Sequence, residues 1–303
     1  VTGSTVIFPL IESSLTSSFS GSGKMWINAD TQNLQYSFQT SLGTVQSPAS
    51  FIGAWSTGGS MNIARVHGAG TGGINAGLAF GGYNPAYQNA TEEYDGSSWS
   101  TGGNMITAIS STAGAGTQNA GIQFGGYYGA PDYRTCTEEY NGSSWSSGGA
   151  LIQARGGSAG MGFQDAALNT GGTVIAGKKT CTEEYNGSAW LAGGALITAR
   201  AFFRGSGTQN AALSISGYSP TMLTSVETYD GTAHSEINPV NFARYSSAAA
   251  GTQNATVFFS GNTSPNYVGC TEEWNGISWI NGCNMSVARG AGMGGGLSQS
   301  STF

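Results

Sequence analysis

Residues 91–99 read Thr-Glu-Glu-Tyr-Asp-Gly-Ser-Ser-Trp, and this phrase returns at intervals of 44 to 46 residues. Residues 137–145 differ only by Asn in place of Asp, and looser copies occupy residues 182–190, 226–234 and 271–279. In each copy an aromatic residue is followed five positions later by Trp, or by His234 in one copy. A repeat of this length, with several short apolar runs per unit, predicts a stacked or radial architecture in which no unit buries its own apolar face.

An arginine follows each Trp position by ten residues, and it extends the count of repeats beyond the five phrases. The arginines are Arg65, Arg155, Arg200, Arg244 and Arg289, with Ile109 as the exception, and Arg65 makes Trp55 the mark of a sixth phase. The last copy stops in its second strand at Phe303, whereas residues 43–57 match the outer half of a unit. We therefore predict an all-β fold, a six-bladed kelch-like β-propeller whose last blade is closed by N- and C-terminal strands, leaving no open edge.

Each unit divides into four short strands. In the second copy, small residues at 112–116 suit the crowded innermost strand, and residues 119–124, 137–140 and 143–145 suit the next three. Asn141-Gly142 separates the last two strands. This dipeptide predicts a two-residue hairpin turn with positive φ at both positions.

Composition excludes several classes of function. The 303 residues include only 10 Lys and Arg against 16 Asp and Glu, for a net charge of −6, and ten cations can hardly build a nucleic-acid-binding face. No apolar run is long enough to cross a bilayer, which predicts no membrane insertion. Four cysteines without a Cys/His cluster give no sign of a metal site, and no motif indicates a cofactor.

The repeat resembles the kelch family. The marks are a double glycine after an apolar run, as in Leu-Ala-Phe-Gly-Gly at residues 78–82, followed by Tyr94 and Trp99. Two departures are the closer spacing of Tyr and Trp, and the decay of the double glycine to Ser216-Gly217 and Ser260-Gly261. This short variety is similar to propeller repeats in tail-fibre and other virion proteins of bacteriophages. The resemblance covers about residues 50–303 and implies a virion protein.

Residues 1–42 lie outside the repeat, so we divide the chain into residues 1–42 and residues 43–303. Residues 24–38 predict a hairpin around positions 30–33, and the apolar run at residues 6–11 predicts an extended arm. An arm that belongs to no blade is expected to dock on its own propeller or on a neighbouring subunit. The partners expected through residues 1–42 are other virion or filament subunits, in a homo-oligomer.

The acidic pairs of the phrase predict a structural role. Adjacent strand residues point to opposite faces, so the two carboxylates of a pair cannot converge on one substrate atom. We instead predict ion pairs, within or between blades, that join one glutamate per blade to an arginine, and Ile109 predicts that the corresponding glutamate in one neighbouring blade lacks its partner. The predicted participants are Arg65, Arg155, Arg200, Arg244, Arg289, Glu93, Glu139, Glu184 and Glu273.

Enzymatic readings find no support. The repeated phrase differs from the Asp box of sialidase propellers, because Gly96 follows Asp95 directly. A copper-radical oxidase needs a set of Tyr, Cys and His ligands, which the two histidines of this chain scarcely provide. Cys270 and Cys283 flank one predicted hairpin, so the spacing allows a disulfide between them.

Candidate binding residues lie where the repeat breaks down. The segments between the double glycine and the Thr-Glu-Glu phrase differ in every copy and carry most of the off-pattern tyrosines. Divergent loops on a rigid scaffold suit contacts with sugar rings or proteins, although they also drift when nothing constrains them. The candidates are Tyr83, Tyr87, Tyr127, Tyr128, Tyr133, Lys178, Lys179, Tyr218 and Tyr267.

The sequence thus predicts a non-enzymatic virion structural or appendage protein whose variable loops contact a cell-surface glycan or a partner subunit. The alternative is a secreted adhesive or filament-forming glycoprotein, for which sugar on the sequons at Asn89 or Asn262 would be the first sign.

Overall fold

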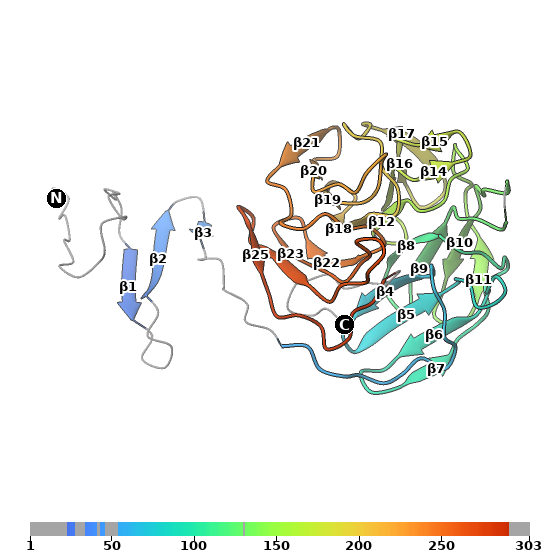
Figure 1. Ribbon diagram of the computed structural model, residues 1–303, viewed down its shortest axis with the longest axis horizontal. Helices are drawn as coiled ribbons and strands as arrows, with labels where there is room; N and C mark the ends of the chain where they lie inside the picture. Colours follow the sequence, from blue (N-terminus) through green and yellow to red (C-terminus); the bar gives the residue numbers. More distant parts are fainter. Residues whose placement is uncertain (1–22, 28–33, 41–42, 46–53, 130, 291–303) are drawn as a thin grey trace. The chain divides into compact units, whose positions relative to one another are not determined.

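The computed structural model describes residues 23–27, 34–40, 43–45, 54–129 and 131–290 (Figure 1). Its regular elements within these ranges are all β-strands. None of the described segments forms a helix of the length and apolarity that a membrane crossing requires. The chain divides into two compact units, Val1–Ser50 and Phe51–Phe303.

The N-terminal unit contains a three-stranded antiparallel sheet. β1 (Gly23–Ile27) pairs with β2 (Leu34–Thr40), which confirms the predicted hairpin, and β2 pairs with β3 (Gly43–Val45). Residues 43–45 therefore belong to this unit, whereas we had assigned them to the propeller. The apolar arm at residues 6–11 lies outside the described residues.

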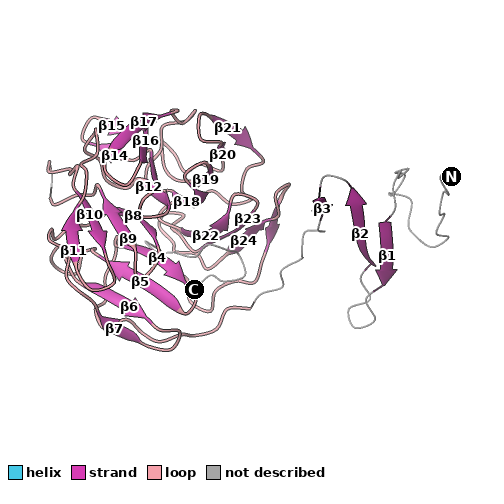
Figure 2. Cartoon of the chain, turned by 180° about the vertical axis from the view of Figure 1, so that it is seen from behind, coloured by secondary structure: helices cyan, strands magenta, loops and turns pink. Residues whose placement is uncertain are grey.

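The second unit is a β-propeller with five four-stranded antiparallel blades in the described part of the chain (Figures 1 and 2). The innermost strands are rich in glycine and alanine because little room exists near the axis, and β4, β8, β12, β18 and β22 follow one another around it. From inside to outside, the blades are β4 (Ala69–Gly73), β5 (Ala76–Phe80), β6 (Thr91–Tyr94) and β7 (Trp99–Thr101); β8 (Ala113–Gly116), β9 (Gly121–Phe124), β10 (Thr137–Tyr140) and β11 (Trp145–Ser147); β12 (Ala159–Gly162), β13 (Ala167–Thr170), β16 (Thr182–Tyr185) and β17 (Trp190–Gly193); β18 (Arg204–Thr208), β19 (Ala211–Ile215), β20 (Val226–Tyr229) and β21 (His234–Ile237); and β22 (Ala248–Thr252), β23 (Ala255–Phe259), β24 (Thr271–Trp274) and β25 (Trp279–Asn281).

The prediction of six blades is wrong, because residues 54–129 and 131–290 form five. The stretch expected to form the outer half of the closing blade does not do so: residues 43–45 pair with β2, and residues 54–61 contain no strand. Trp55 nevertheless contacts the last blade, where its Nε1 donates to Thr271 Oγ1 at 3.0 Å and its ring lies 4.7 Å from that of Phe259. Residues 291–303, which were expected to supply the inner half, lie outside the described residues.

The hairpin between the third and fourth strands has four loop residues, so the prediction of a two-residue turn was also wrong. Tyr94 pairs with Trp99, and Tyr140 pairs with Trp145 in the same way. Only the glycine of each Asp-Gly or Asn-Gly pair has positive φ, because the side-chain oxygen of the preceding residue accepts two backbone N–H groups and fixes the turn. The paired aromatic rings lie 5.0 Å apart in both hairpins.

Neighbouring blades are joined by repeated side-chain contacts. Trp145 packs edge-on against Phe80 of the preceding blade and donates to Thr91 Oγ1 at 2.9 Å. Gln118 donates to the carbonyls of Gly77 and Tyr94, which pair with each other at one end of the second and third strands of that blade. Gln164, Gln209 and Gln253 make the equivalent pair of bonds in the following blades. The glutamine of the Gly-Thr-Gln-Asn motif is thus an inter-blade clamp, a role that the sequence analysis missed.

Candidate functional site

The propeller has two faces with different chemistry. The loops between second and third strands pair with the connections from one blade to the next, as Tyr83 does with Val66 and Tyr127 with Ser110. We call the surface formed by these segments the loop face. At the other end of each blade the two hairpins meet, so that Gly96 lies beside Asn75. We call that surface the turn face.

Five of the predicted tyrosines form one cluster on the loop face of the first two blades. The ring of Tyr87 lies 5.3 Å from Tyr83, 6.0 Å from Tyr127 and 4.6 Å from Tyr128. Tyr133 joins through Tyr127, at 5.4 Å. Tyr83 and Tyr128 keep 41% and 47% of their surface exposed, so the cluster offers ring area to a ligand. We call these five residues the tyrosine cluster.

The cluster also presents polar groups. Burial, with the neighbouring Tyr127, raises the pKa of Tyr87 and of Tyr133, so their hydroxyls stay neutral donors at physiological pH. Arg134 lies 6.0 Å over the ring of Tyr128 and forms an exposed ion pair with Asp132 at 2.5 Å. An aromatic platform bordered by a cation and hydroxyls suits a ligand that has both an apolar face and polar edges.

The other predicted binding residues do not join the cluster. Lys178 lies 5.1 Å over the ring of Tyr218, which in turn is 5.6 Å from Tyr245. Lys179 is half-buried, and its backbone N–H donates to Gly172. Tyr267 is 59% exposed, and no ring contact joins it to another described residue. The loop face therefore has one compact aromatic site and a second, smaller aromatic and cationic pair.

The predicted arginine and glutamate pairs exist, but with the other glutamate of each doublet. Buried pairs join Arg65 to Glu92 at 2.5 Å and Arg200 to Glu227 at 2.6 Å. Arg155 pairs with Glu183, and Arg244 with Glu272. Each pair lies within one blade and ties its inbound connection to the third strand. Arg289, by contrast, is exposed and has no ion pair among the described residues.

Glu93, Glu139, Glu184 and Glu273 were therefore assigned the wrong partner. The first three accept hydrogen bonds from the tyrosine hydroxyls of the following blade, as Glu139 does from Tyr185 at 2.6 Å. Tyr140 and Tyr229 make the equivalent bonds to Glu93 and Glu184. Strand pleating separates the two carboxylates of a doublet, but pleating alone does not say which face meets the arginine.

Ile109 leaves Glu138 of its own blade without an arginine, whereas we expected the unpartnered glutamate in a neighbouring blade and at the second position of the doublet. The Glu138 carboxylate is buried and accepts the backbone N–H groups of Ile106 and Thr107. Gln123 partly replaces the missing cation, because its amide donates to the Gly125 carbonyl at 2.6 Å, as Arg65 donates to Gly81 in the first blade.

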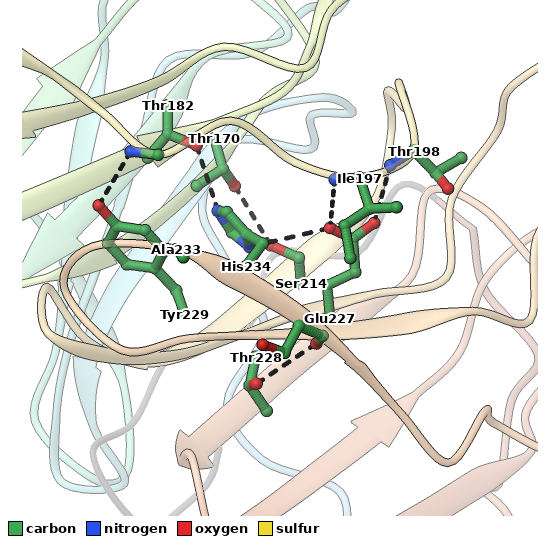
Figure 3. Close-up of polar contacts among 12 residues, drawn as sticks. Thr170, Thr182, Ile197, Thr198, Ser214, Glu227, Thr228, Tyr229, Ala233 and His234 are labelled. Atoms are coloured by element: carbon green, nitrogen blue, oxygen red, sulfur yellow. Dashed lines mark hydrogen bonds and ion pairs between the residues drawn. The ribbon is translucent and has the colours of Figure 1, made fainter.

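The fourth blade carries His234 where other blades have Trp (Figure 3). Its ring stacks on Tyr229 at 4.6 Å, and its Nε2 lies 3.2 Å from Thr182 Oγ1, in the place of an indole N–H. Its Nδ1 lies 3.9 Å from Glu227, and burial lowers the pKa of the imidazole. His234 is a structural substitute for tryptophan.

All four cysteines are free thiols, so the predicted disulfide between Cys270 and Cys283 is not formed. The ladder of β24 and β25 ends between Glu272 and Asn281, and the Cys283 carbonyl instead accepts a bond from Trp55. Burial raises the pKa of the Cys136 thiol to about 11, whereas Cys283 is exposed.

The chain matches no family model, and no curated protein matches its sequence. Solved structures do match its fold, among them the structure of YjhT. That match has a TM-score of 0.65 at 13% sequence identity and covers 77% of this chain and 88% of YjhT. At this identity the likeness concerns the fold, and it supports a β-propeller.

Proposed function

We propose that this chain is a non-enzymatic virion structural protein, of the appendage kind, whose loop face binds a glycan on the host-cell surface. The observation that carries the glycan proposal is the tyrosine cluster. Its exposed rings, Tyr83 and Tyr128, come from two divergent loops on a rigid scaffold. Flat aromatic rings pack against the C–H faces of sugars, and nearby hydroxyls bond the sugar edges.

The repeated carboxylates support a role without catalysis. Four of them are buried against arginines, and three more accept tyrosine hydroxyls. These groups hold the blades together, so the doublets that invite a catalytic reading are already committed to the scaffold. The virion setting and the kelch-type classification rest on the resemblance of the repeat, and the attachment of the chain to other subunits is proposed for residues 1–42.

The environment of Asn89 argues against a glycan at this sequon, and so against the secreted-glycoprotein alternative. The amide nitrogen of this side chain donates to the Met105 carbonyl at 3.2 Å in a partly buried site. N-glycosylation places a bulky sugar on that nitrogen, which this partly buried site would have to accommodate. Mass spectrometry of the natural protein at Asn89 and Asn262, together with a search for the chain in purified virus particles, decides between the two settings.

Substitution of the exposed tyrosines tests the glycan proposal. We expect Tyr83→Ala and Tyr128→Ala each to weaken binding in a glycan array or by calorimetry, by about 0.5–1.5 kcal/mol per lost ring contact. Phe163→Ala is the control, because Phe163 is 37% exposed in a hairpin of the turn face. Equal losses for all three variants, or no glycan binding by the wild-type chain, would contradict the proposal.

A further inference from the structure

The charges of the propeller are sorted between its two faces. Four of its described arginines form the buried ion pairs. Every other Lys or Arg between residues 54 and 290 lies in a segment of the loop face or at the loop-face end of an inner strand, and these residues are Arg134, Lys178, Lys179, Arg204 and Arg289. Because the chain has a net charge of −6, the gathering of these cations on one face does not follow from composition.

Arg204 marks the centre of the loop face. It begins the innermost strand β18, where the other blades have Ala69, Ala113, Ala159 and Ala248. Arg204 lines an axial cavity of about 10 Å³ together with His67 and Ser111. Burial lowers the pKa of Arg204 to about 10, so it remains charged at neutral pH.

The exposed acids lie elsewhere. Asp95 and Asp230 begin hairpin loops of the turn face, and Asp165 lies in a third hairpin there. Glu236 is exposed on the outer strand β21. On the loop face, among the described residues, the exposed carboxylate is that of Asp132, which forms an ion pair with Arg134 at 2.5 Å, so the net positive charge of this face comes from its other cations. The two faces therefore differ in sign, positive on the loop face and negative on the turn face.

We propose that the loop face binds acidic glycans, whose sugar units bear carboxylate or sulfate groups. This inference rests on the proposed function and narrows its ligand. Arg134 lies over the same ring, Tyr128, that is exposed for stacking, so a sugar packed on Tyr128 places its acidic group within reach of a guanidinium. Lys178 lies 5.1 Å over the half-buried ring of Tyr218. Guanidinium and ammonium groups bind carboxylate and sulfate by charge-assisted hydrogen bonds.

The probes for the test are alginate and dextran sulfate, which are acidic, and unmodified dextran, which is neutral. In affinity electrophoresis, we expect only the acidic polymers in the gel to slow the migration of the full chain. This retardation should fall as NaCl is raised, because salt screens exposed charges. The combined variant Arg134→Gln, Lys178→Gln and Lys179→Gln should lose roughly tenfold or more in affinity for them.

The matched control changes net charge on the other face. Asp95→Asn with Asp230→Asn removes two negative charges, and the repeat itself tolerates Asn there, as Asn141 and Asn186 show. We expect this variant to bind the acidic polymers as the wild type does. If it gains affinity as strongly as the cation variant loses it, net charge and not the loop face controls binding, and the inference fails.

The two proposals fail separately. Equal binding of dextran and the acidic polymers, with loss in Tyr128→Ala, overturns the acidic-glycan inference and leaves the glycan proposal standing. Binding of none of the three polymers, together with an empty glycan array, overturns both.

Discussion

A tyrosine hydroxyl from the following blade reaches Glu93, Glu139 and Glu184, whereas Glu273 receives no hydrogen bond from any described residue. The fourth blade has Thr228 at this position and needs no such donor. Glu273 is buried, and burial raises the pKa of its carboxyl above the ordinary value of 4.5. The folded state therefore favours the protonated form of this carboxyl.

The sign of the pH effect follows from that shift. A raised pKa in the folded state gives stability that is complete at low pH and is lost as pH rises through the folded pKa. We expect Glu273→Gln, which cannot ionise, to raise the thermal unfolding midpoint at pH 7 and to leave it unchanged near pH 4.

Glu236→Gln is the control for that measurement. It removes the same charge from an exposed position on β21, so its midpoint should follow the wild type at both pH values. A stabilisation by Glu273→Gln that is equal at pH 4 and pH 7 would contradict the account.

At the scale of the strand and its inbound connection, the buried arginine determines the geometry. Arg200 donates to the carbonyls of Ser216 and Ser225 as well as to Glu227, so it joins three segments of one blade. Removing one partner of a buried pair leaves a desolvated charge, which costs much more than losing an exposed pair.

Arg200→Met should therefore lower the free energy of unfolding by about 3–5 kcal/mol. Arg134→Met removes an ion pair whose side chains are 42% exposed, and should cost at most about 1 kcal/mol. Urea denaturation of both variants measures the difference. Similar losses would show that burial does not control the contribution of these pairs.

The strands were predictable because each repeat carries its own turn and pleat signals, and the innermost, second and third strands lie where the sequence placed them. Which glutamate of each doublet pairs with the arginine was not predictable, because strand alternation does not tell which of the two faces meets the arginine. One signal was present: the fourth copy has Glu227 without a second glutamate, yet retains Arg200. That copy alone identifies the first position of the doublet as the arginine partner.

At the scale of the whole molecule, sequence periodicity overstated the blade count. The segment that ends at Trp55, with Arg65 in phase, predicts the outer half of a blade, but a tryptophan can keep its packing partners without a strand around it. The tyrosines of the cluster were named from the sequence as candidate binding residues, and their binding stays a prediction. Each loop was recognised by its departure from the repeat, but contact between loops of two blades depends on blade angle, which no single repeat encodes.

Trp55 provides the last prediction, because it connects the first residues of the propeller to the fifth blade. Its Nε1 donates to Thr271 Oγ1 and to the Cys283 carbonyl, and its ring packs on Phe259. Trp55→Ala should lower the free energy of unfolding by less than the roughly 3–5 kcal/mol typical of a fully buried aromatic, since Trp55 is half-buried. The loss should be local, so hydrogen exchange should accelerate in β23 and β24. The control is Trp99→Ala, at a half-buried Trp bonded to Gly59, which should leave the amides of β24 protected. If exchange in β24 is unchanged in Trp55→Ala, the contacts of Trp55 do not hold the last blade in place.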